Sequence, residues 1–150
     1  MQHVNSSNMG VYLNLAQAYE AEFSPLTGKL PHPNGLYELD TIIAGSVIGY
    51  IEYYEQRPIG IAAVKKTHSC LEMKEFYIVP NKRMGGIGKV FAHKILSQHL
   101  GPWEILQISG ADHATQFWRK ALSSFGVTYV EDVHFDPYWK WVTRQSFEMK

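Results

Sequence analysis

The segment EFYIVPNKRMGGIGKVFAHKIL, residues 75–96, constrains the fold of this chain more than any other part of the sequence. An apolar run typical of a strand ends at Pro80, three glycines follow in a short turn, and an apolar pattern with helical spacing comes next. Proline cannot extend the hydrogen bonding of a strand, and glycine lets the backbone turn sharply. The sequence therefore predicts a strand that passes through a glycine turn into a helix. The free amides at the start of such a helix, together with its dipole, favour an anion.

Three phosphate-binding patterns make different demands on this turn. A P-loop needs a glycine separated by four residues from a Gly-Lys pair, with a hydroxyl residue after the pair. Arg83 and Val90 stand at those two positions, so the P-loop is excluded. A dinucleotide fingerprint needs a third glycine where this chain has Phe91. A third pattern, Arg or Gln followed by x-x-Gly-x-Gly, is met by Arg83, Gly86 and Gly88. This spacing favours a pyrophosphate as the bound anion.

The rest of the chain alternates helical and strand patterns, mostly in hairpin order. The first helix is expected to end before Ser24–Gly35, a proline- and glycine-rich loop whose length suggests that it covers something. The second helix is expected to bury Val90 and to stop at Gly101-Pro102. This order predicts one domain, 1–150, of the α+β (mixed α/β layered) class. Helices are predicted over 8–23, 88–100 and 111–125, and strands over 48–54, 59–65, 70–79, 103–109, 127–133 and 138–147.

Composition argues against several classes of function. Hydrophobic residues make up 45% of the chain and charged residues 19%, which is ordinary for a soluble globular protein. The net charge of zero argues against a general nucleic-acid binder, and no apolar run reaches the length of about 18 residues that a membrane span needs. The single cysteine, Cys70, permits no internal disulfide, so we expect a reducing, cytoplasmic location. The first residues lack the pattern of a signal peptide.

The strand–turn–helix segment resembles the GNAT (Gcn5-related N-acetyltransferase) superfamily. A second block, WEILQISGADHATQFWRKAL, is similar to a later strand and helix of that superfamily, in which an alanine and an aromatic pair recur. Here these residues are Ala114, Phe117 and Trp118. The first half, with NLAQAYEAEFSPLTG followed by NGLYELD, resembles a bacterial subgroup of predicted acetyltransferases. The resemblance covers most of the chain.

The resemblance implies a twisted mixed sheet whose central strands, here 72–79 and 103–109, splay apart between flanking helices. It also implies acetyl-CoA as the acetyl donor. The pantetheine arm would pair with the first splayed strand, the diphosphate would rest on the glycine turn, and the helix 111–125 would flank the thiol. The residues implied to bind the cofactor are Phe76, Tyr77, Ile78, Arg83, Met84, Gly85, Gly86, Ile87, Gly88, Lys89, Phe117 and Trp118.

Direct transfer of the acetyl group requires a base, because only a neutral amine attacks the thioester. Glu72 and Glu75 are the candidates on the central strand, with water chains as an alternative. Being three residues apart, they would face opposite sides of a regular strand. This strand often carries a bulge in the superfamily, so both glutamates remain candidates.

The departing thiolate has no obvious acid in this sequence. Many members of the superfamily have a tyrosine where this chain has Trp118, and an indole N–H is not a useful proton donor. Tyr77 and Tyr129 are the alternatives, or no acid is needed because a thiol with a pKa of about 8.5 leaves readily as thiolate. Ala111 also departs from the asparagine that is common at its position. The candidate catalytic residues are therefore Glu72, Glu75 and Tyr77.

The expected acceptor is an amine of a small molecule or peptide, with Glu20, Glu22 and Glu38 as possible partners if that acceptor is cationic. No metal is expected, because the seven histidines follow no ligand spacing. Trp139 and Trp141 are expected to share a strand face in the core or in a homodimer, since dimers are common in this fold. A CoA-binding regulatory or interaction module with weak or lost catalysis is the alternative function.

Overall fold

Seven strands form one mixed sheet in the computed structural model, which describes residues 1–150. The strand order is β1-β2-β3-β4-β5-β7-β6, and every neighbouring pair is antiparallel except β4 and β5, which are parallel. This arrangement confirms the predicted α+β class. The strands are β1 (Gln2–His3), β2 (Val47–Tyr54), β3 (Arg57–Lys66), β4 (Leu71–Ile78), β5 (Gly101–Ile108), β6 (Tyr129–Asp136) and β7 (Lys140–Met149).

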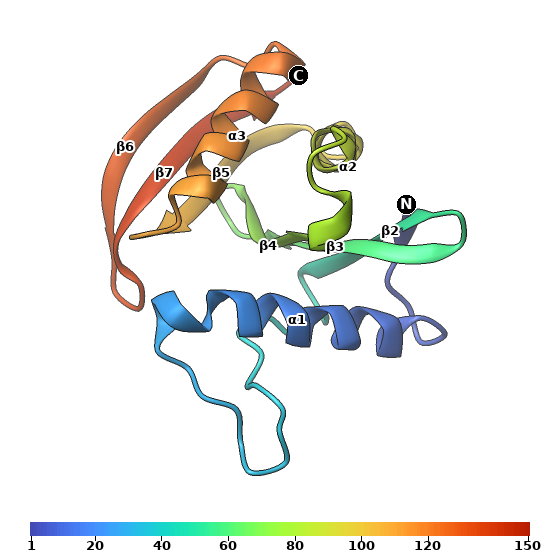
Figure 1. Cartoon of the computed structure of the whole chain (residues 1–150). Helices are drawn as coiled ribbons and strands as arrows, with labels where there is room; N and C mark the ends of the chain where they lie inside the picture. The colour runs from blue at the N-terminus through green and yellow to red at the C-terminus, as the bar shows by residue number, and fades with distance from the viewer.

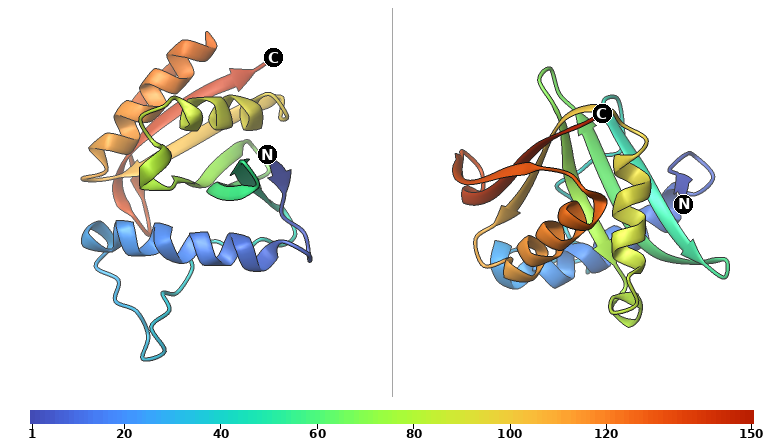
Figure 2. Two further views of the ribbon diagram at one scale, coloured as in Figure 1. Left: turned by 45° about the vertical axis from the view of Figure 1, so that its right-hand side comes forward. Right: turned by 90° about the horizontal axis from the view of Figure 1, so that it is seen from above.

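Helices cover both faces of the sheet. Figure 1 shows α1 (Met9–Thr27) on one face and α2 (Ile87–Leu96) with α3 (Asp112–Phe125) on the other, and Figure 2 shows the same layers from two more sides. Along β3, Ile61 and Ala63 pack toward α1, while Ala62 and Val64 belong to the larger core beneath α2 and α3. A strand buried on both faces reads as an unbroken apolar run, as β3 does. No helix combines the length and the apolar character needed to cross a lipid bilayer.

The first helix runs four residues beyond the predicted end at Phe23. It continues through Pro25 to Thr27 and ends at Gly28, which has a left-handed φ of 72°. Proline lacks the N–H that would bond to the carbonyl of Ala21, and the hydroxyl of Ser24 donates to that carbonyl instead, at 2.8 Å. This local replacement explains why the proline does not stop the helix.

The second helix is shorter than predicted. It ends at Leu96, and Gly101-Pro102, which was expected to stop it, begins β5. Val90, which was expected to be buried, has 51% of its surface exposed. Its neighbours Phe91 and Ile95 fill the core, so the apolar stripe of this helix is narrower than the sequence suggests.

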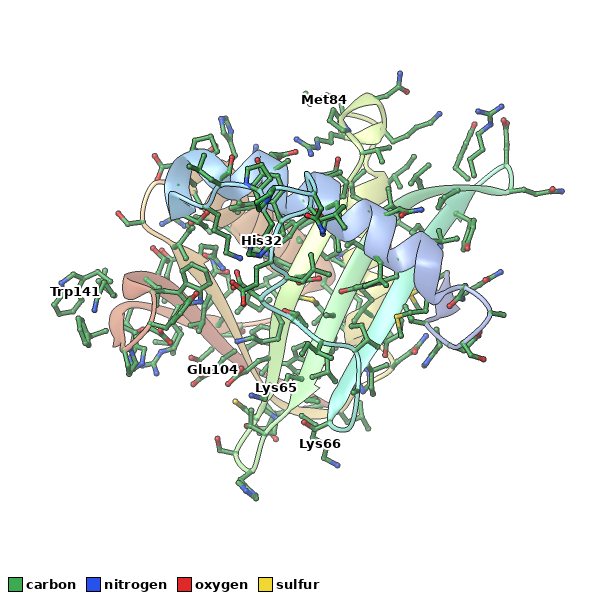
Figure 3. The ribbon with its side chains drawn as sticks, turned by 90° about the horizontal axis from the view of Figure 1, so that it is seen from below. His32, Lys65, Lys66, Met84, Glu104 and Trp141 are labelled. Atoms are coloured by element: carbon green, nitrogen blue, oxygen red, sulfur yellow. The ribbon has the colours of Figure 1, made fainter.

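The last two strands meet in a turn that lies later than predicted. The turn falls at 137–139, where Oδ1 of Asp136 accepts hydrogen bonds from the amides of Tyr138 and Trp139 at 2.8 and 2.7 Å. The expectation that Trp139 and Trp141 share a strand face was wrong, because only Trp141 is in a strand. Trp141 projects outward at the edge of the molecule in Figure 3.

The central strands splay apart as predicted. Parallel pairing of β4 with β5 is confined to Leu71–Met73 and Trp103–Ile105. On its other edge β4 carries a bulge, because Ala63 of β3 pairs with Glu75 while the next residue, Val64, pairs with Met73. The extra residue of β4 changes which side chains face each side of the sheet beyond it.

Candidate active site

Two cavities lie along the splay between β4 and β5. On the α1 side lies a cavity of about 500 Å³, which we name the acidic cavity. Between the last turns of α1, the end of β4, the glycine turn and α3 lies one of about 640 Å³, the aromatic cavity. A narrow hollow of about 70 Å³ shares Met73, Glu75 and Leu106 with the first and Phe76, Ala111 and Trp118 with the second.

The acidic cavity is enclosed by α1, the loop that follows it, the splayed strands and the β6–β7 turn. Its lining residues are Tyr19, Glu38, Leu39, Asp40, Thr41, Glu72, Met73, Lys74, Glu75, Leu106, Ile108, Asp136, Tyr138 and Trp139. The aromatic cavity is lined by Glu22, Phe23, Leu26, Phe76, Tyr77, Ile78, Arg83, Met84, Gly88, Gly110, Ala111, His113, Ala114, Phe117 and Trp118.

An aromatic cluster forms the wall of the aromatic cavity. The ring of Phe76 stacks on Phe117 with centroids 5.2 Å apart and meets the edge of Trp118 at 5.0 Å. Gly88 lets α2 approach this cluster, because a Cβ at that position would lie 3.2 Å from the ring of Phe117. The cluster therefore brings Phe76, Phe117 and Trp118 together in the wall of this cavity.

The glycine turn presents six consecutive backbone amides, from Met84 to Lys89, that donate no hydrogen bond within the protein. Gly86 caps α2 with a φ of 78°, a conformation that glycine adopts without strain. Met84 stands at the tip of the turn and is fully exposed (Figure 3). Free amides at a helix start fit an anion such as a diphosphate.

Arg83 connects the glycine turn to the end of β4 and to α1. Its Nε donates to the carbonyl of Ile78 at 2.8 Å, and its guanidinium forms an ion pair with Glu22 at 2.6 Å. The same guanidinium lies 5.4 Å from the centre of the Tyr77 ring. These contacts tie the end of β4 to α1, so Arg83 holds the turn in place.

Glu75 lies where the acidic cavity meets the strand gap, and it is 2% exposed. Its Oε2 accepts a hydrogen bond from the hydroxyl of Tyr12 on α1, while its Oε1 has no hydrogen-bond partner. Burial raises the pKa of Glu75 to about 7 against the hydrogen-bonding effects of Tyr12 and Thr41, and the charges of Glu20 and Asp40 raise it further. A carboxyl group tuned to this range exchanges protons readily near neutral pH.

The bulge in β4 decides how the two candidate bases are placed. Glu72 and Glu75 both line the acidic cavity, although a regular strand would point them to opposite faces. Glu72 is less buried, with 23% of its side chain exposed, and its Oε2 lies 3.4 Å from Nζ of Lys74. Glu75 is therefore the only one of the two that is nearly enclosed.

The two tyrosines considered as the acid for the thiolate differ in position. Tyr77 lines the aromatic cavity, whereas Tyr129 lines neither cavity. Burial, followed by the charge of Glu22, raises the pKa of Tyr77, so its phenol keeps the proton at neutral pH. Of the residues offered as partners for a cationic acceptor, Glu38 lines the acidic cavity, while Glu20 and Glu22 form ion pairs with Lys29 and Arg83.

Several residues of the site were not assigned to it from the sequence. The apolar spacing of the first helix predicts that Tyr12 lies in the core or in the wall of an acceptor pocket, but its bond to Glu75 was not predicted, although a buried tyrosine hydroxyl needs a partner. Thr41 comes from an irregular loop, so no pattern pointed to it, and the alternating pattern placed Trp139 on a strand face and not in the turn that it occupies.

The loop after α1 is held against that helix by polar contacts. Nζ of Lys29 forms ion pairs with Glu20 at 2.9 Å and Asp40 at 2.7 Å. The side chain of Gln17 exchanges two hydrogen bonds with the backbone of Tyr37, at 3.0 and 2.7 Å. Figure 3 shows the part of the loop that carries His32 on the same face of the sheet as α1. These contacts set residues 38–41 along the acidic cavity.

Comparisons with known proteins identify the architecture. No family model and no curated protein matches the sequence. Among solved structures, a proposed GNAT-family acetyltransferase of Bacteroides thetaiotaomicron is similar with a TM-score of 0.69 and 16% identity, over 100% of this chain and 88% of that one.

Two further structures extend the likeness. A CoA-dependent acyl-homoserine lactone synthase, BjaI, has a TM-score of 0.60 and 11% identity, over 99% of this chain and 82% of that one. A GNAT family acetyltransferase from Elizabethkingia anophelis with acetyl-CoA bound has a TM-score of 0.51 and 12% identity, over 70% of this chain and 76% of that one. Identities this low establish the fold alone. The chain has the fold of the GNAT acyltransferases, which the resemblance carried by its strand–turn–helix segment implied.

Proposed function

We propose that this protein is an acetyl-CoA-dependent N-acetyltransferase that acts on a primary amine. The observation that carries this proposal is the position of Glu75, a nearly enclosed carboxyl with a pKa of about 7, between two cavities of different chemistry. The aromatic cavity suits the donor and the acidic cavity suits a cationic acceptor. The strand gap between them is the natural place for the acetyl group to pass.

The donor side fits coenzyme A in two respects. The free amides of Met84–Lys89 would hold the diphosphate, and Arg83 keeps that turn in place. Beyond Met73 the edge of β4 that faces β5 has no strand partner, so the backbone of Phe76–Ile78 is available to the amide-rich pantetheine arm. Phe117 and Trp118 would flank that arm.

We assign two tasks to the residues of this chain: they move protons at the reacting groups, and they hold the base in position. Glu75 takes a proton from the acceptor ammonium through its unpartnered Oε1, while Tyr12 holds Oε2. The neutral amine then attacks the thioester carbonyl, forming a C–N bond. The C–S bond breaks with its electron pair leaving on sulfur, and the new amide nitrogen gives up its second proton to solvent. Tyr77 is the one tyrosine that lines the aromatic cavity, and we assign to it the protonation of the thiolate.

Release of free CoA thiol from acetyl-CoA across a panel of amines tests this function. We expect amine-dependent release, with the acetylated amine detected by mass spectrometry. Trp118, at the position where the resemblance leads one to expect a tyrosine, favours the second candidate, a CoA-binding module without catalysis. Micromolar binding of CoA with no turnover of any amine would establish the module instead. Protection of the fold by ATP but not by CoA would contradict both.

A further inference from the structure

The acidic cavity carries more negative charge than one reacting amine requires. Five of its lining residues are acidic, and Lys74 is the only basic one. Three of the carboxylates already have partners: Asp40 pairs with Lys29, Glu72 lies near Lys74, and Asp136 accepts two backbone amides.

Two of the carboxylates are not satisfied in this way. Glu38 is exposed and lines the cavity; its carboxylate makes no hydrogen bond and no ion pair with the protein, while its backbone carbonyl accepts a hydrogen bond from Nζ of Lys29 at 3.1 Å. Glu75 is 2% exposed, and its Oε1 has no partner. For Glu75, a buried oxygen without a partner is costly, and a ligand that donates a hydrogen bond to Oε1 would satisfy it. The cavity thus offers two separate carboxylates to a ligand.

Aromatic side chains complete this cavity. Tyr19, Tyr138 and Trp139 line it, and the faces of such rings attract ammonium groups. The one basic residue, Lys74, already lies 3.4 Å from Glu72, so little positive charge remains for an anionic substituent. The acidic cavity has a volume of about 500 Å³, which is within the usual range for small-molecule sites.

We propose that the acceptor is a small dicationic amine, with its reacting nitrogen at Glu75 and its second ammonium at Glu38 beside the aromatic rings. This inference rests on the proposed function and specifies its substrate class. A monoamine of the same length leaves Glu38 without a partner. An amine with a carboxylate at the far end places a negative charge among the acidic side chains and is rejected.

Three amines of equal chain length test the substrate class: cadaverine, n-pentylamine and δ-aminovalerate. With acetyl-CoA in excess, cadaverine is expected to have a KM about tenfold below that of n-pentylamine, and δ-aminovalerate is expected to give no measurable turnover. The preference should weaken as salt is added, because partly exposed ion pairs are screened. Equal KM values for the diamine and the monoamine would overturn the inference and leave the proposed function standing.

A pair of variants locates the second ammonium. Glu38→Gln is expected to raise the KM for cadaverine about fivefold and to raise that for n-pentylamine by much less, because the monoamine has no ammonium at this position. Glu148→Gln, a change at an exposed glutamate of β7 outside both cavities, serves as the control and should alter neither. An unchanged ratio of the two KM values in Glu38→Gln overturns the assignment.

Calorimetry separates this inference from the proposed function. Cadaverine is expected to bind the CoA-loaded protein more tightly than n-pentylamine, and Glu38→Gln should remove the difference. If no amine turns over but this binding pattern holds, acetyl transfer is contradicted while the dicationic site stands. If cadaverine does not bind, the dicationic site is contradicted whatever amine turns over.

Discussion

Tyr12 of α1 donates its hydroxyl hydrogen bond to Oε2 of Glu75 on β4, and both residues are buried. This bond joins the helix on one face of the sheet to the strand that borders the gap. It fixes one carboxylate oxygen and leaves the other without a partner. Burial raises the pKa of Tyr12 above its ordinary value, followed by the charge of Glu75, so the phenol remains a donor at neutral pH.

Removing this hydroxyl should shift the pH dependence of catalysis. The bond from Tyr12 stabilises the charged form of Glu75, so Tyr12→Phe raises the pKa of that carboxyl above about 7. The acidic limb of kcat/KM is therefore expected to move to higher pH, by about one unit. A pH–rate profile of the variant measures the shift. A limb that stays in place or moves to lower pH would show that Tyr12 does not act on the titrating group.

Glu75 should also make folding stability depend on pH. Its pKa is raised from 4.5 in the ordinary state to about 7, so the folded protein holds this proton more tightly than the unfolded chain. The stabilisation is complete below about pH 4.5 and is lost as the pH rises through about 7, an effect of roughly 3 kcal/mol. Urea unfolding across this range should show the loss in the wild type and in the control Glu148→Gln but not in Glu75→Gln. A wild-type stability that does not fall in this window contradicts the buried-carboxyl account.

The glycine turn is best tested at Gly85. A Cβ there meets no atom within 4 Å and its φ is not positive, whereas Gly86 has a φ of 78° and Gly88 packs on Phe117. Gly85→Ala should therefore fold and keep its affinity for CoA. Gly85→Asp places a negative charge among the free amides and is expected to weaken CoA binding by about tenfold or more. Equal dissociation constants of CoA for the two variants would contradict the assignment of the diphosphate site to this turn.

The ion pairs of Lys29 with Glu20 and Asp40, which hold the loop after α1, should stabilise the folded protein. Lys29→Met leaves Glu20, whose side chain is 2% exposed, without its cation. Breaking a buried pair in this way is expected to lower the free energy of unfolding by about 3 kcal/mol. Lys29→Arg retains the charge and is the matched control. If thermal and urea unfolding of Lys29→Met match the wild type, the loop is held by other contacts.

The donor half of the site could be predicted because its information is local. One continuous segment contains the strand, the glycine turn and the start of the next helix, and a second contains Phe117 and Trp118. Spacing within these segments was enough to exclude two other phosphate sites, and the family resemblance that they carry implied the splayed strands. The structure agrees with the placement of these elements at the level of the fold.

The residues around the acidic cavity could not be predicted from local patterns, because segments that are distant in the sequence meet there. Tyr12, Asp40 and Trp139 come from a helix, an irregular loop and a turn, and only tertiary packing brings them near β4. The bulge that places Glu72 and Glu75 in the same cavity depends on pairing with β3, which strand parity does not reveal. The helix through Pro25 was missed for a related reason, since a serine hydroxyl compensates for the missing amide.

The pH dependence of acetyl transfer by the wild type and by Glu75→Gln tests the central claim most directly. Acetylated cadaverine is measured by mass spectrometry between about pH 6 and 9, with Glu148→Gln as the control. The account predicts a wild-type limb near the pKa of about 7. It also predicts that Glu75→Gln loses this limb and about a hundredfold in kcat/KM while its CoA affinity is unchanged. A Glu75→Gln variant with the rate and pH profile of the wild type would contradict it.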